Sequence, residues 1–154
     1  VAKFGAVTAI IGAFTAAVSG AISITKDFDD TVTDFKKVSD LSGDSLDNYT
    51  KKLGDLGETV SRTRTEMVEA SGEFVKSGYS ESDSAQLALV ASLYQNIADS
   101  QLTAAQSSGV IISQLKAFNL TADDSMKVID SINEVDILAF PFGNIWVTKD
   151  NYIG

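Results

Sequence analysis

The chain has 154 residues, 44% of them hydrophobic and 21% charged, which suffices for one ordinary domain. It contains neither cysteine nor histidine, which excludes disulfide frameworks, thiol nucleophiles, histidine-based catalytic triads and histidine-ligated metals. The net charge of −9 sets 12 Lys and Arg against 21 Asp and Glu, so no nucleic-acid binding is predicted. Because the chain begins with Val, we expect it to be either a processed product or a piece of a longer protein.

The first feature along the chain is the uncharged run of residues 4–25. As a helix it would rise about 33 Å, enough to cross a bilayer. Two interpretations are open: a membrane-spanning helix, and a helix packed against protein. Ala, Gly, Thr and Ser fill more than half of the run, and these residues drive membrane insertion weakly compared with Leu, Ile or Phe. The composition therefore favours packing against protein.

Apolar residues in the first 35 positions recur at alternating steps of three and four, the spacing of a coiled-coil seam. The register continues without a break into the acidic stretch that begins near Asp27. We therefore predict one long helix over residues 1–40, apolar first and acidic later, that associates with other copies of the chain. The residues assigned to this helix association are Phe4, Val7, Ile11, Phe14, Val18, Phe28, Val32 and Phe35.

Residues 41–135 are predicted to form a helical core region of shorter helices. We expect Ser42-Gly43 to stop the long helix. We expect Gly54 and Gly57 to bend or end the next helix, since a glycine costs about 1 kcal/mol relative to alanine in a helix. The expected helix starts are Asp44 or Ser45, Thr63 with Glu66 as a capping box, Asp83 or Ser84, and Thr121 to Asp124.

The helix predicted over residues 82–100 is apolar on almost all sides, so we expect it to be the central buried helix. The side chains expected to be largely buried are Leu89, Leu93, Ile97, Ile112, Leu115 and Ile129.

The last segment, residues 136–154, holds the only proline and the only tryptophan of the chain. Apolar runs flank a Pro-Phe-Gly-Asn turn at 141–144, a pattern typical of a β-hairpin. The predicted fold class is therefore all-α: an elongated apolar N-terminal helix followed by a multi-helix bundle, with a short C-terminal β-hairpin.

Two acidic pairs, Asp29-Asp30 and Asp123-Asp124, are candidate cation sites. Adjacent side chains on a helix do not face each other, and neither pair has the oxygen ladder and turn glycine of a calcium loop. Asp123-Asp124 instead fits the first turn of a helix, where the dipole favours carboxylates. We predict no catalytic, cofactor or metal site, and we do not expect an enzyme.

Five short motifs follow one another in the second half of the chain. They are Ser77-Gly78-Tyr79, Leu87-Ala88-Leu89, Ala104-Ala105-Gln106, Ala117-Phe118-Asn119-Leu120 and Ala122-Asp123-Asp124. In this order they resemble the core region of the tail tape measure proteins of long-tailed bacteriophages. The resemblance covers roughly residues 20–135.

The resemblance implies a structural protein of a phage or prophage tail. Such a protein occupies the tail tube during assembly, sets the tail length and is later ejected, with contact to the host membrane in some members. Its partners would be the tail tube, tail assembly proteins and further copies of itself. Two alternatives stay open: a holin-like or pore-forming protein that inserts through residues 4–25, and a soluble helical adaptor.

Overall fold

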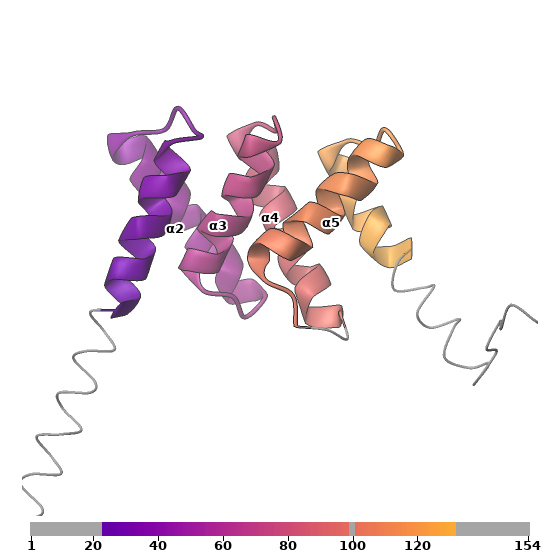
Figure 1. Cartoon of the computed structure of the whole chain (residues 1–154), viewed down its shortest axis with the longest axis horizontal. Coiled ribbons are helices and arrows are strands. Elements are labelled where there is room, and N and C mark those ends of the chain that lie inside the picture. The colour runs from indigo at the N-terminus through magenta and orange to yellow at the C-terminus, as the bar shows by residue number, and fades with distance from the viewer. Residues whose placement is uncertain (1–22, 99–100, 132–154) are drawn as a thin grey trace, which may run out of the picture.

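The computed structural model describes residues 23–98 and 101–131, and every element within these ranges is helical. The predicted all-α class is thus confirmed for this part of the chain. Figure 1 shows the helices following one another along the long axis in chain order. They are helix 23–36, α2 (Gly43–Thr59), α3 (Arg64–Lys76), α4 (Glu81–Ile97), α5 (Ala104–Ala117) and the 3₁₀ turn η1 (Ala122–Asp124), which continues as helix 125–131.

Two predicted features lie outside the described residues. They are the apolar part of the N-terminal helix, up to residue 22, and the C-terminal hairpin within residues 136–154. Among the helices of residues 23–98 and 101–131, none has the length and apolar character that a membrane span requires.

The first helix ends at residue 36, not at Asp40 as predicted. The N–H groups of Val38 and Ser39 both donate to the carbonyl of Phe35, each at 3.1 Å. The bond from Val38 spans three residues where an α-helical bond spans four, and such a bond tightens and closes the last turn of a helix.

Ser42-Gly43 begins α2, where we had predicted that it would stop the preceding helix. The Ser42 N–H donates to the Ser45 hydroxyl oxygen at 3.2 Å, so Ser45 caps from inside the helix. The predicted start at Asp44 or Ser45 was therefore slightly late. Gly43 has φ +53°, a left-handed conformation that glycine adopts without a steric penalty.

The predicted early end of the helix at Gly54 or Gly57 was wrong, because α2 continues through both to Thr59. A β-carbon on Gly57 would lie 2.7 Å from the Arg62 carbonyl oxygen and 2.8 Å from the Met67 Cγ. Close packing on the following loop and helix thus requires a glycine here. The gain from this packing outweighs the low helix propensity of Gly57.

The capping box at Thr63 and Glu66 is confirmed. The Thr63 N–H donates to the Glu66 carboxylate at 2.8 Å, and the Glu66 N–H donates to the Thr63 hydroxyl at 3.2 Å. The next helix, α4, begins earlier than predicted, because its cap is Ser80, whose hydroxyl accepts from the N–H of Asp83 at 3.1 Å. Asp83 therefore lies inside the first turn, where its negative charge is favourable.

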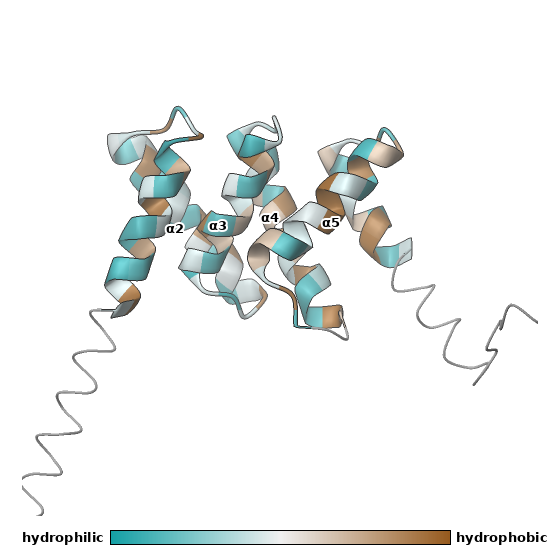
Figure 2. Ribbon diagram, in the orientation of Figure 1, coloured by the Kyte–Doolittle hydropathy of each residue, from teal (hydrophilic) through white to brown (hydrophobic). Residues whose placement is uncertain are grey.

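The core has two parts that meet at α3 and α4. The first joins helix 23–36 and α2 to these two helices, around Phe35, Leu53 and Met67. The second joins α5 and helix 125–131 to them, around Phe74 and Ile111. Figure 2 shows hydrophobic residues recurring between hydrophilic ones along the helices, as such two-sided packing requires.

The predicted burial of Leu115 and Ile129 is confirmed, whereas Leu89, Leu93 and Ile112 are only half-buried. The helix predicted as central, now α4, does pack against α2, α3, α5 and η1. It shares the central position with α3, which contacts α2, α4 and α5.

The predicted burial of Ile97 was wrong, since its side chain is 42% exposed. The buried face of α4 carries mainly small residues, including Ser84, Ala88, Ala91 and Ser92. Small side chains allow α3 and α5 to approach this face closely. The longer side chains of Leu89, Leu93 and Ile97, which form the neighbouring row on α4, therefore lie at the margin of the core.

Two glycine-to-alanine changes test the role of close packing. Gly57→Ala should lower the free energy of unfolding by about 1–3 kcal/mol, because the new methyl group overpacks the contact with Met67. Gly109→Ala in α5 should raise it by up to about 1 kcal/mol, because no atom lies within 4 Å of the added carbon. Urea unfolding measures both. Equal stabilisation by the two changes would contradict this account.

Candidate functional site

The junction of helix 23–36 with α2 and α3 holds the described residues of the predicted association seam. Phe35 is 2% exposed and belongs to the first part of the core, while Phe28 and Val32 are half-buried against it. These three side chains contact their own chain, and their assignment to contacts between copies stays a prediction. The other predicted seam residues, Phe4, Val7, Ile11, Phe14 and Val18, lie outside the described residues.

Phe28 is held by a cation–π contact. The guanidinium carbon of Arg64 lies 4.7 Å from the centre of the Phe28 ring. The edge of the same guanidinium donates to α2, from Nε to the Thr50 carbonyl at 2.9 Å and from Nη2 to the Thr50 hydroxyl at 2.7 Å. Arg64, at the start of α3, therefore links three helices. The face of its guanidinium lies toward helix 23–36 and the edge toward α2.

Tyr49 joins four helices at this junction. Its ring stacks on Phe35 at a centroid distance of 5.5 Å. Its hydroxyl donates to the carbonyl of Glu81, the first residue of α4, at 2.6 Å and accepts from the Ser71 hydroxyl at 2.7 Å. Burial of the phenol raises the pKa of Tyr49 to about 12. Sequence analysis missed this role; the available signal was a polar-tipped aromatic on an apolar helix face.

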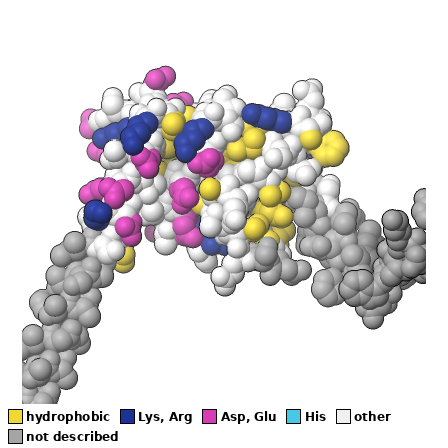
Figure 3. Space-filling view, viewed as in Figure 1, with side chains coloured by type: hydrophobic (Ala, Val, Ile, Leu, Met, Phe, Trp, Pro, Cys, Tyr) yellow, Lys and Arg dark blue, Asp and Glu magenta, His cyan; other side chains and the backbone are white. Residues whose placement is uncertain are grey.

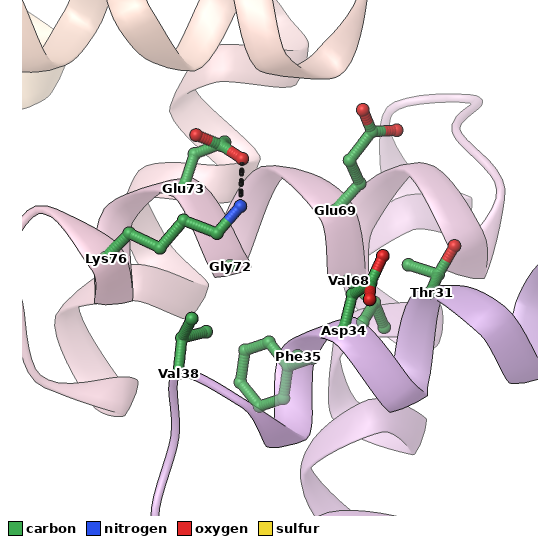
Figure 4. A pocket seen from close by; sticks show the side chains of 9 residues that line it. All are labelled: Thr31, Asp34, Phe35, Val38, Val68, Glu69, Gly72, Glu73 and Lys76. Atoms are coloured by element: carbon green, nitrogen blue, oxygen red, sulfur yellow. Dashed lines mark hydrogen bonds and ion pairs between the residues drawn. The ribbon is translucent and has the colours of Figure 1, made fainter.

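A groove of about 300 Å³ lies between helix 23–36 and α3, as Figure 4 shows. Its floor is apolar, and carboxylates stand at its rim. A hydrogen bond from Lys37 at 2.7 Å holds the pKa of Asp34 below its ordinary value. Burial, with repulsion from Glu73 and Glu66, raises the pKa of Glu69. The lining residues are Thr31, Asp34, Phe35, Val38, Val68, Glu69, Gly72, Glu73 and Lys76.

A second groove, of about 360 Å³, lies at the turn from α2 to α3. Its basic side chains are engaged within the protein. Lys51 pairs with Asp55 at 3.2 Å, and Arg62 donates to Asn96 at 2.7 Å. The guanidinium of Arg64 donates to Thr50, so each of the three basic side chains has a hydrogen-bond partner within the protein.

The acidic pair Asp123-Asp124 caps a helix, as predicted. The Asp124 carboxylate accepts from Lys127 at 2.7 Å and from the Thr121 hydroxyl at 2.9 Å. These hydrogen bonds lower the pKa of Asp124 to about 2. In the part of the chain that the structure describes, no group of three or more acidic side chains is placed to hold a metal ion.

On the face seen in Figure 3, acidic side chains gather over the half with helix 23–36, α2 and α3, and the larger apolar patches lie over the opposite half. Basic side chains follow the upper edge across both halves. Among the described residues, the large apolar side chains on the surface include Phe118, 68% exposed, and Met126, 43% exposed.

No protein-family model matches the chain, and no solved structure matches it.

Tyr49→Phe tests the polar part of the junction. The change should lower the free energy of unfolding by about 1–2 kcal/mol near neutral pH, because the Glu81 carbonyl loses its donor while the ring stack stays. The folded pKa of about 12 lies above the ordinary value of 10.0, so this contribution is complete below pH 10 and is lost as the pH rises toward 12. Urea unfolding over this range measures the difference from wild type.

Tyr94→Phe is the matched control for that experiment, because the Tyr94 hydroxyl makes no hydrogen bond among the described residues. It should leave the free energy of unfolding nearly unchanged. An equal loss in the two variants would show that the bonds of Tyr49 contribute nothing specific.

Proposed function

We propose that this chain is part of a phage tail tape measure protein that occupies the tail tube and sets the tail length during assembly. The observation that carries the proposal is the ordered series of five motifs, together with the positions of these motifs in the fold. Four of them lie at helix ends, and the fifth lies on the buried face of α4.

The helix-end motifs contain residues that the local backbone needs. Gly78 has φ +93° directly after α3, and Tyr79 packs edge-on against Phe74 at 6.0 Å. Gln106 accepts from the Thr103 N–H at 2.9 Å at the start of α5. These motifs thus specify where α3 ends and where α5 starts. We expect a family of proteins built from successive helices to retain residues of this kind.

Of the other motifs, one ends α5 and one lies in the core. Asn119 has φ +52°, and the N–H of Leu120 returns to the Leu115 carbonyl at 2.8 Å, which ends α5. The Leu-Ala-Leu motif places Leu87 and Ala88, both 0% exposed, in the core. A family that fixes helix ends and one buried helix face would contain these residue types in this order.

The arrangement of the helices is compatible with a length-setting role. Figure 1 shows that the chain advances along one axis as its helices succeed one another. Because the helices fold back on each other, the advance per residue is smaller than the 1.5 Å rise of a single straight helix. Added helices would therefore add length, in steps shorter than a continuous rod would give.

Changing the number of helices in the parent phage protein tests the proposal. Duplication of residues 64–117 should lengthen the tail by a fixed step, and removal of residues 81–117 should shorten it by less than the ~55 Å of a straight helix of that length. Tail lengths are read from electron micrographs, with Gly109→Ala as the length-neutral control. Unchanged tails that contain the altered protein would refute a length-setting role.

Membrane activity through residues 4–25 is the second candidate, and the uncharged composition of that run favours it. Sedimentation and liposome flotation of the full chain, beside a chain lacking residues 1–22, separate the two. We expect the full chain to sediment as an oligomer without floating, and the shortened chain to be a monomer. Flotation that disappears with the deletion would instead favour the membrane candidate.

A further inference from the structure

Side-chain hydrogen bonds join the helices α2 to α5 to one another. Each bond connects two elements that are distant in the sequence or separated by a turn, so the four helices are held by specific polar contacts as well as by apolar packing. The pairs are Arg64 with Thr50, Tyr49 with Ser71, Ser92 with Met67, Gln95 with Leu102, and Lys116 with Ser77.

Helix 23–36 is attached differently. Between Lys26 and Val38, the side-chain hydrogen bonds and ion pairs stay within the helix and its closing turn: Thr31 bonds to Asp27, Lys26 pairs with Asp30, and Lys37 pairs with Asp34. Phe28, Val32 and Phe35 contact the rest of the protein through apolar packing and, at Phe28, through the cation–π contact with Arg64.

Helix 23–36 also buries only a small part of its surface against the rest of the protein. Phe35 is the one buried side chain between residues 23 and 38, and the groove described above separates part of the helix from α3. A β-carbon on Gly72 would lie 3.6 Å from Phe35, an ordinary contact distance, so there is room for a methyl group between α3 and the ring. The connection to α2, residues 39–42, is not helical, and Gly43 at its end has nothing within 4 Å of a β-carbon position.

We infer that helix 23–36 is a separable arm, which undocks as a unit while α2 to α5 stay folded. Segments with few buried contacts open at lower free energy than the core that they cover. Undocking uncovers the Tyr49 ring and Val68 and removes Phe28 from Arg64. It also frees Phe28, Val32 and Phe35, so any association of copies through these side chains competes with docking inside one chain. The arm does not depend on the proposed tail function.

Thiol reactivity tests the arm, because the full chain contains no cysteine. Val68→Cys places a reporter under the arm, and Ala88→Cys places a matched control in the same core cluster; both wild-type residues are 0% exposed. With dithiobis(nitrobenzoate) under native conditions, the thiol at position 68 should react at least about tenfold faster than the thiol at position 88. Equal rates would overturn the inference.

Ile111→Val, added to each reporter, separates undocking from global unfolding. Ile111 is 0% exposed in α5 and does not contact the arm cluster, so its truncation destabilises the docked and undocked forms equally. It should accelerate reaction at position 88 by about twofold to tenfold and leave the rate at position 68 unchanged. The same acceleration at both positions would show that Val68 is reached only by global unfolding, and would overturn the inference.

A distance measurement keeps the test independent of buried substitutions. Lys36→Cys and Lys52→Cys are changes at exposed positions on the arm and on α2, and both can carry nitroxide labels in one chain. Below the urea concentration of global unfolding, double electron–electron resonance should show a second, longer distance whose share grows with urea. A single distance up to the global transition would overturn the inference.

Discussion

The packing of α3 against α2 determines where the other helices lie. Gly57 admits Met67, and Arg64 bonds to Thr50, so the two helices are fixed by a close apolar contact and a polar one. Met67 in turn accepts a hydrogen bond from Ser92 of α4 at 3.2 Å. Tyr49, placed by the same contact, meets the arm on one side and α4 on the other.

Small residues make this close packing possible, and they have a cost. Ala and Ser on the facing sides of α3, α4 and α5 bury less apolar area than Leu or Ile would, so each helix pair gains less from the hydrophobic effect. The hydroxyls of Ser84 and Ser108 are buried without a partner among the described residues, which costs about 1–3 kcal/mol each. A core of this kind relies on dense contact, and so it tolerates little added volume.

Ion pairs contribute little to how the helices are arranged. Those of the described residues join positions three or four apart, such as Lys51 with Asp55 and Lys76 with Glu73. Pairs at this spacing support single helices by a few tenths of a kcal/mol and do not connect one helix to another. Neutral hydrogen bonds and apolar contacts therefore hold the helices α2 to α5 together, and the attachment of the arm depends on a few side chains, chiefly Phe28, Val32 and Phe35.

The sequence by itself determined the helical class of the described residues and the helix starts at Thr63 and Thr121. Each of these depends on residues three or four positions apart, which the chain brings together wherever the helix forms. Only the tertiary structure decided that α2 passes through Gly57, that Ile97 is exposed, and that Phe35 faces Tyr49 of its own chain. Burial of a helix face depends on contacts between residues distant in the sequence, and periodicity shows that a face is apolar without showing what covers it.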